Sequence, residues 1–192
     1  MFPNRADLRS DLPDHGLALL AAGGDRTAFG HLVRRHGAQV RLILRRMGAD
    51  LARADDVAQE AFIAAFRAIA DFRGETSFPG WIRAIAIRKY LRFLKSEQRW
   101  AQVSAEAALD AGRAILPDPD PGLRRDLDQA LQALSEMERI SVTLCHGAGF
   151  SHKEAATALN LPVGTVKSHV KRGLDKLRAR LAPDSLTLRK VG

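Results

Sequence analysis

Apolar side chains recur every three or four positions along most of this chain, which is the spacing of an amphipathic α-helix. The clearest stripe lies near the C-terminus with spacings of i, i+4, i+8, i+11 and i+15, and it comprises Val166, Val170, Leu174, Leu177 and Leu181. No segment sustains the alternation of apolar and polar residues that marks a half-buried strand. The pattern therefore predicts an all-α protein.

Several helices are predicted in the first half of the chain, separated by glycines and polar residues. They comprise a short helix that ends at Gly23-Gly24, a second that ends near Gly48, and two longer helices over residues 50–69 and 81–100. Residues 71–80 are predicted to form a loop, because glycine and proline bracket a polar stretch. The helix after this loop carries a basic stripe on one face, formed by Arg88, Arg92, Lys95 and Arg99.

Residues 104–122 differ in composition from the segments on either side, since they lack aromatic residues and contain three closely spaced prolines and several acids. The run Pro-Asp-Pro-Asp-Pro cannot lie inside a helix, so we expect a flexible, acidic, Pro-rich linker. The linker separates two small helical domains, residues 15–103 and 123–182. Residues 183–192 follow as a C-terminal tail.

The second domain is predicted to contain four helices, the last two of which form a helix-turn-helix. Two capping boxes mark helix starts, because a serine and the glutamate three residues later each accept the other's backbone amide hydrogen. The pairs are Ser135 with Glu138 and Ser151 with Glu154. Residues 160–164 supply the turn, and Pro162 stands where a first helical turn tolerates a missing amide hydrogen.

The last helix is strongly basic on the face opposite its apolar stripe. That face has a single acid, Asp175, and its basic residues are Lys167, Lys171, Arg172, Lys176, Arg178 and Arg180. Such a helix suits the phosphates of a DNA groove, while an ordinary solvated face is the alternative. Gly173 inside the helix costs up to about 1 kcal/mol relative to alanine, so we expect it to lie against a neighbouring helix or DNA.

Composition narrows the class of protein. Of the 192 residues 46% are apolar, enough for real cores, and the net charge of +8 favours a polyanionic partner: nucleic acid, an acidic protein or an anionic membrane. No run reaches the roughly 18 apolar residues of a membrane span, and the N-terminus lacks the apolar core of a signal peptide, so we expect a cytoplasmic protein. The one cysteine, Cys145, excludes an internal disulfide, and its apolar neighbours predict a buried, inert thiol.

The sequence gives little support to an enzyme. It contains no glycine-rich phosphate loop, no nucleophile elbow and no zincin spacing, so we expect neither catalysis nor a bound cofactor. Cys145, His146 and His152 are separated by a Gly-rich turn, which is weak support for a metal site. A structural role is favoured for these three residues, and no metal ion is expected.

Four motifs together resemble the extracytoplasmic-function (ECF) sigma factors, a group of bacterial alternative sigma factors. They are GDRTAFGHLVRRHG (24–37), DDVAQEAFIAAFRAI (55–69), FRGETSFPGWIRAIA (72–86) and PVGTVKSHVKRGLDKLR (162–178). The resemblance implies a first domain, region 2, that binds core RNA polymerase and recognises and melts the promoter −10 element. It implies a second domain, region 4, that reads the −35 element, and a linker that threads toward the active-site cleft and RNA exit path.

The same resemblance implies the partners of the chain. These are core RNA polymerase, through its β′ clamp helices and β flap, promoter DNA, and a cognate anti-sigma factor, with no small-molecule substrate and no membrane insertion. The clamp helices would dock on Asp55, Asp56, Gln59 and Glu60. An ordinary role beside the positive end of a helix dipole is the alternative for the two aspartates.

DNA-contacting residues are also implied by the resemblance. In the −10 element, a flipped base and the phosphates that follow would meet Phe72, Arg73, Gly74, Glu75, Thr76, Ser77, Phe78, Trp81, Arg88, Arg92 and Lys95. The −35 duplex would meet Thr165, Lys167, Ser168, His169, Lys171, Arg172 and Lys176. Arg172 is expected to contact a guanine, and His169 departs from the family pattern, in which arginine is usual. A core role for Trp81 and a solvated face for the basic stripe are the alternatives.

A stand-alone helix-turn-helix repressor, or the output half of a response regulator, is the second class of function that the sequence allows. Either would need a dimerisation surface or a receiver domain in the first 100 residues. The polymerase-binding motifs occupy that part of the chain instead.

Overall fold

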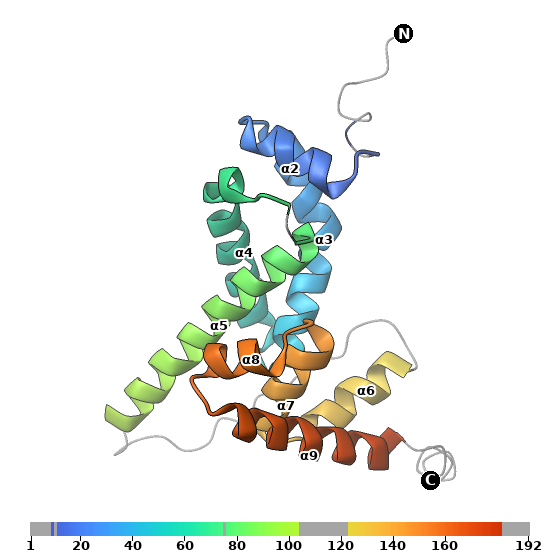
Figure 1. The fold of residues 1–192 in the computed structure, drawn as a ribbon, viewed down its shortest axis with the longest axis vertical. Coiled ribbons are helices and arrows are strands. Elements are labelled where there is room, and N and C mark those ends of the chain that lie inside the picture. Colours follow the sequence, from blue (N-terminus) through green and yellow to red (C-terminus); the bar gives the residue numbers. More distant parts are fainter. Residues whose placement is uncertain (1–8, 10, 75, 104–122, 182–192) are drawn as a thin grey trace. The chain divides into compact units, whose positions relative to one another are not determined.

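The computed structural model describes residues 9, 11–74, 76–103 and 123–181, and all regular structure among them is helical (Figure 1). These residues divide into two compact units, each described by itself. The first holds α2 to α5, and the second holds α6 to α9 together with residues 45–51. The predicted linker over 104–122 and tail over 183–192 lie outside the described residues.

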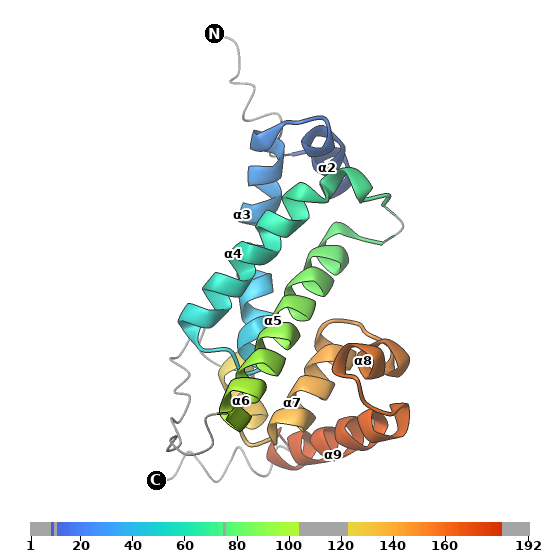
Figure 2. The same ribbon diagram turned by 90° about the vertical axis from the view of Figure 1, so that its left-hand side faces the viewer.

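Three long helices and one short helix build the first unit (Figure 2). They are α2 (Asp14–Ala22), α3 (Arg26–Arg46), α4 (Leu51–Arg67) and α5 (Phe78–Val103), with a 3-10 turn η1 (Ile69–Asp71) after α4. The Asp25 carboxylate starts α3, because its Oδ1 accepts the amide hydrogens of Thr27 at 3.0 Å and Ala28 at 3.1 Å. Helix α2 packs on η1 and α5, at the end of the unit where the α4–α5 loop turns (Figure 1).

The predicted loop over residues 71–80 is wrong at its C-terminal end, because α5 begins at Phe78 rather than Trp81. Ser77 accounts for the earlier start: its Oγ accepts the amide hydrogen of Gly80 at 3.3 Å, as an N-cap does. Pro79 then falls in the first turn of the helix, where no amide hydrogen is needed. The helix also runs to Val103, beyond the predicted end at residue 100.

Four helices make up the second unit, as predicted. They are α6 (Leu123–Gln132), α7 (Glu136–Val142), α8 (His152–Leu159) and α9 (Val163–Leu181), and α7 continues as a π-helical segment η2 (Thr143–Gly147). Both capping boxes form, with Ser135 at the start of α7 and Ser151 at the start of α8. Asn160, with φ of 55°, ends α8 in the left-handed conformation and opens the turn to α9.

Helix α9 packs against α6, α7 and α8 through its predicted apolar stripe (Figure 1). Val166, Val170 and Leu177 are buried, while Leu174 and Leu181 are partly buried against the cluster around Val142. A Cβ atom on Gly173 would lie 2.7 Å from Val142 Cγ2 and 3.5 Å from the Glu138 carbonyl oxygen. The small residue is therefore required by a close approach of α9 to α7, and not by DNA.

No helix among the described residues is both long enough and apolar enough to cross a bilayer. This agrees with the absence of a long apolar run in the sequence.

Replacing Gly173 with alanine is expected to lower the free energy of unfolding by about 1 kcal/mol. Overpacking against the stiff Val142 side chain costs about 1–3 kcal/mol, which exceeds the helix-propensity gain of at most about 1 kcal/mol. The matched control is Gly164→Ala in the same helix, where a new Cβ meets no atom within 4 Å. Urea unfolding followed by circular dichroism compares them, and equal stability of the two variants would contradict the close packing.

Candidate polymerase and nucleic-acid interfaces

An acidic and amide-bearing face runs along α4. Asp55, Asp56, Gln59 and Glu60 are all exposed and are spaced so that they share one side of the helix. Because α4 begins at Leu51, neither aspartate lies in the first turn, where the helix dipole acts most strongly. The alternative role of the aspartates, as ordinary dipole partners, is therefore weakened.

A groove of about 710 Å³ between α3 and α4 adjoins this face. Its apolar wall is built on three phenylalanines, with Phe29 stacked edge-on against Phe62 and Phe66 at centroid distances of 6.4 and 5.0 Å. Polar residues also line the groove, and these are Arg41, Asp55, Gln59 and Arg67. Ile63 also lines the groove, and its apolar side chain is 45% exposed to solvent. Sequence reasoning missed this groove, because the phenylalanines fit the pattern of core residues.

Not every residue of the acidic face lines the groove. Asp55 does, and its Oδ1 lies 3.5 Å from Arg41 Nε across the opening between the helices. Glu60 turns toward α5 instead and accepts a hydrogen bond from Lys89 Nζ at 3.1 Å. The predicted four residues thus share a helix face, but they differ in which neighbouring helix they meet.

The loop between η1 and α5 rests on an aromatic cluster. Phe72, Phe78 and Trp81 lie 5.1 to 5.8 Å apart by ring centroids. Phe78 is only 2% exposed, so it supports the loop from beneath and presents almost no surface to the −10 strand that it was expected to meet. Phe72 and Trp81 are partly exposed, and so Trp81 is not simply a core residue.

The remaining predicted residues of the loop and stripe are solvent-facing where the structure describes them. Arg73, Gly74, Thr76 and Ser77 are exposed in the loop, and Gly74 has φ of 73°, a conformation that favours glycine. Glu75 lies outside the described residues. On α5, the side chains of Arg88, Arg92 and Lys95 are exposed on one face of the helix. The side chain of Arg99 lies outside the described part of the structure.

The polar side chains in the first turns of α9 differ in their exposure and in whether they are hydrogen-bonded within the protein. Lys167, Lys171 and Arg172 are exposed. Ser168 is also exposed, but its hydroxyl donates to the Gly164 carbonyl at 3.0 Å and is engaged with its own helix. The ring of His169 is half-buried and its Nδ1 lies 3.2 Å from Arg172 Nη2, so these two side chains are held together. Thr165 is half-buried as well.

Family models match both units of the chain. The Sigma-70 region 2 model matches residues 32–100, and the Sigma-70 region 4 model matches residues 124–177. The chain is 35% identical to the RNA polymerase sigma-H factor of Pseudomonas aeruginosa, across 83% of this chain and 89% of that protein. It is 33% identical to the ECF RNA polymerase sigma factor SigE of Mycolicibacterium smegmatis, across 92% of this chain and 71% of that protein. The chain belongs to the ECF family of sigma factors.

As an ECF sigma factor, the protein binds core RNA polymerase and promoter DNA and directs transcription initiation. The resemblance drawn from the four motifs is thereby confirmed, and the repressor alternative is excluded. Sigma factors are initiation factors rather than enzymes, in line with the expectation drawn from the sequence.

Solved sigma factors share the fold of this ECF sigma factor. The sigma factor RpoE of Bartonella quintana, solved with the anti-sigma factor NepR, matches with a TM-score of 0.61 and 24% identity, across 81% of this chain and 98% of that one. CnrH, solved with the cytosolic domain of CnrY, matches with a TM-score of 0.55 and 32% identity, across 90% and 99%. The all-α fold of two helical domains is confirmed by these matches.

Glu138 links two helices of the sigma factor's second unit, a role that the sequence did not reveal. Its side chain is 6% exposed, and its carboxylate accepts hydrogen bonds from the Ser135 amide at 3.1 Å and from Lys176 Nζ at 2.7 Å. Arg172 Nε lies 3.8 Å from the other carboxylate oxygen. The hydrogen bond from Lys176 is the main cause that lowers the pKa of Glu138, against the opposing effect of burial. Lys176, predicted to contact DNA, is thus tied to α7.

The prediction of a buried, inert thiol at Cys145 agrees with the structure only in part. The thiol lies in η2 and is half-buried rather than buried, and this burial raises its pKa, which keeps the thiol protonated and unreactive. His146 is exposed and His152 is half-buried. The described part of the chain contains no group of three side chains that could hold a metal ion.

Lys176→Met is expected to lower the free energy of unfolding by about 1 kcal/mol at neutral pH, because the buried carboxylate of Glu138 loses its charged hydrogen-bond donor and keeps only the more distant Arg172 as a cation. Since the pKa of Glu138 is lowered on folding, the stabilisation is complete above the ordinary value of 4.5 and is lost as the pH falls through the folded value. The difference between parent and variant should therefore shrink in acid. Lys171→Met, which changes an exposed lysine on the same helix, is the control. Urea unfolding at several pH values gives the free energy of unfolding of each protein. A difference between parent and Lys176→Met that did not change with pH would refute the pairing of Lys176 with Glu138.

Proposed function

We propose that the two units of this ECF sigma factor divide promoter recognition between them. Residues 15–103 act as region 2, which docks on core polymerase and captures the melted −10 strand, and residues 123–182 act as region 4, which reads the −35 duplex. Residues 104–122 connect them and 183–192 form a tail. The observation that carries the proposal is the separation of surfaces: an acidic face beside an apolar groove on α4, and basic faces on α5 and α9. The protein acts in the cytoplasm, without catalysis or a cofactor.

The α4 face and its groove form the polymerase-docking surface. Basic residues of a clamp helix would meet Asp55, Asp56, Gln59 and Glu60, and its apolar residues would cover the groove wall at Ile63. An exposed apolar side chain among polar ones is typical of a protein interface. An anti-sigma factor is a further proposed partner, since the similar sigma factor RpoE was solved with the anti-sigma factor NepR and CnrH with the cytosolic domain of CnrY. Co-purification from the native host tests that partner, and capture of polymerase alone would count against it.

Asp56→Lys is expected to weaken binding to core RNA polymerase about tenfold, because it sets a like charge against basic residues of the clamp. Asp56 is exposed, so its replacement should leave the fold intact. Asp71→Lys makes the same change in net charge on η1, away from the groove, and is the matched control. Titration of labelled core polymerase measures both, and equal affinity of the two variants would remove α4 from the docking surface.

The loop and the α5 stripe form the surface for the −10 strand. Phe72 and Trp81 offer partly exposed rings on which an unstacked base could stack, beside exposed backbone at Gly74. Arg88, Arg92 and Lys95 continue along α5 on one face and suit the phosphates of the same strand. Phe78 supports this surface without touching DNA, as its burial requires.

The start of α9 forms the surface for the −35 duplex. Lys167, Lys171 and Arg172 are exposed on the early turns that a recognition helix places in the major groove. Arg172 has the guanidinium fork that pairs with guanine. Its neighbours His169 and Glu138 hold the fork near one orientation before DNA binds. Thr165, Ser168 and Lys176 are then left to position the helix on phosphate rather than to read bases.

Arg172→Ala is expected to reduce initiation from the cognate promoter at least about tenfold, the value of one bidentate base contact, and to leave core binding unchanged. Arg178→Ala in the last turn of α9 removes the same charge away from the bases and is the control. Run-off transcription together with core titration separates the two effects. Loss of core binding along with initiation would mean that Arg172 is structural.

Promoter-directing activity itself is tested with purified core polymerase on fragmented genomic DNA, with and without the protein, followed by sequencing of RNA ends. New discrete start sites that share upstream −35 and −10 motifs are expected. An unchanged set of RNA ends would refute the proposal.

A further inference from the structure

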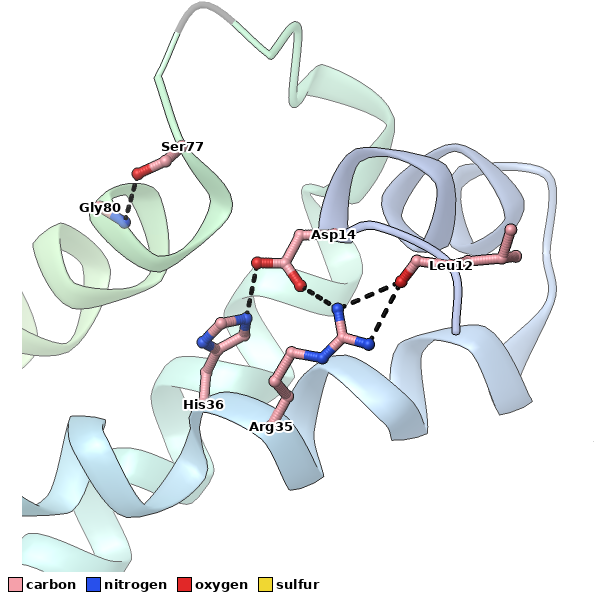
Figure 3. Close-up of polar contacts among 6 residues, drawn as sticks. All are labelled: Leu12, Asp14, Arg35, His36, Ser77 and Gly80. Carbon is pink, nitrogen blue, oxygen red and sulfur yellow. Dashed lines mark hydrogen bonds and ion pairs between the residues drawn. The ribbon is translucent and has the colours of Figure 1, made fainter. Parts of the chain in front are cut away.

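The first turn of α2 is tied to α3 by a charged cluster (Figure 3). Asp14 Oδ2 lies 2.8 Å from His36 Nε2, and Asp14 Oδ1 accepts a hydrogen bond from Arg35 Nη1 at 2.6 Å. An ionised carboxylate can only accept, so His36 holds its proton on Nε2 toward Asp14. Arg35 also donates to the Leu12 carbonyl at 3.2 Å, which fixes the segment that leads into α2.

The histidine of this cluster contacts the loop assigned to the −10 strand. His36 is buried, and its ring centroid lies 5.6 Å from that of Phe78, the first residue of α5. Phe78 in turn contacts both Phe72 and Trp81, the two partly exposed rings of the aromatic cluster. A continuous path of contacts therefore joins Asp14 to the proposed base-stacking surface.

A second contact reaches the loop from the same turn of α2. A Cβ built on Gly74 would lie only 3.0 Å from the Cε1 and Nδ1 atoms of His15, the residue after Asp14. Gly74 thus lies close to one edge of the His15 ring, and its backbone has a φ of 73°. The N-terminal turn of α2 supports the loop at Gly74 and, through His36, at Phe78.

We propose that Asp14 and His36 are positioning residues for −10 recognition, which hold Phe72, Gly74 and Phe78 in the arrangement that accepts a base. The inference rests on the proposed role of that loop in the −10 strand. Neither residue needs to touch DNA: Asp14 fixes the ring of His36, and His36 fixes Phe78 beneath the exposed rings. Part of this support lies outside the matched region 2 segment, which begins at residue 32, after α2.

A packing role alone would predict a different result from a positioning role. If the cluster only fastened α2 to α3, its loss would lower stability without a preference for any one ligand. If it positions the loop, its loss should weaken capture of the −10 strand, while the α4 face and the α9 surface, which contain none of the cluster's residues, keep their affinities. Small displacements of recognition groups are costly in binding, which makes the second effect measurable.

The experiment uses holoenzyme assembled from core polymerase and the full chain, with a fluorescent single-stranded oligonucleotide of the non-template −10 sequence from a promoter mapped by run-off transcription. Asp14→Ala removes the carboxylate, and His36→Phe keeps a ring against Phe78 but removes the N–H. Each is expected to weaken binding of the strand about tenfold, the scale of a lost charge-assisted hydrogen bond. The double variant should bind no more weakly than either single one, because the two residues act as a unit.

Arg34→Ala, exposed on α3 beside the cluster but outside it, is the control and should bind as the parent does. Affinities for core polymerase and for a −35 duplex should stay unchanged in all variants. Asp14→Asn keeps the size of the side chain and one hydrogen-bond acceptor, so it is expected to give an intermediate loss of affinity for the −10 strand. It replaces the other variants if Asp14→Ala or His36→Phe prevents folding. Parent-like binding of the −10 strand by Asp14→Ala and His36→Phe overturns the inference, as does an equal fall in core binding. Failure of the parent holoenzyme to bind the strand refutes the proposed function of the loop instead.

Discussion

Unpaired amide hydrogens at helix N-termini are the constraint on which both recognition surfaces depend. The first amides of a helix have no partner inside it, so a side chain must supply one and thereby fixes where the helix begins. Ser77 does this for α5 and moves its start to Phe78, which turns Phe78 inward and shortens the loop beside it. Ser151 does the same for α8, while Asn160 in the left-handed conformation ends that helix and opens the turn to α9. The caps thus decide which residues solvent, and hence a partner, can reach.

Close packing of α9 against α7 gives the basic residues of α9 different roles. Gly173 lets the helix approach α7, and at that distance Glu138 can bind Lys176 as well as cap its own helix. Lys176 therefore helps to hold α9 in place, while Lys167, Lys171 and Arg172 lie exposed on the surface proposed to meet DNA. A buried carboxylate that loses its cation would be costly, so this arrangement also keeps the helix from rotating on its neighbour.

Much of the fold follows from the sequence, since helical periodicity and capping boxes are local signals. The start of α5 was predicted wrongly, and the burial of Phe78 was not foreseen. An aromatic residue in a polar stretch is ambiguous until its partner His36 is known, and His36 lies far away in the sequence. The second role of Glu138 and the Asp14–His36 pair were missed for the same reason: each joins helices across more than twenty residues. The groove between α3 and α4 was missed because the sequence pattern of an apolar helix face is the same in two cases. The pattern does not distinguish an apolar face that is fully packed against a neighbouring helix from one that lines an open groove.

Charge is distributed within the first unit so that two unlike partners can bind one small domain. Acids dominate the exposed face of α4 and bases that of α5, although the chain as a whole is strongly basic. Glu60 and Lys89 pair where the two helices meet, which neutralises the boundary and leaves each face its own sign. Opposite potentials on adjacent faces favour the proposed division, in which the acidic face meets a basic protein surface and the basic face meets a nucleic acid. In the roles proposed for the two faces, the separation of charge, more than the net charge, lets polymerase and promoter bind at the same time.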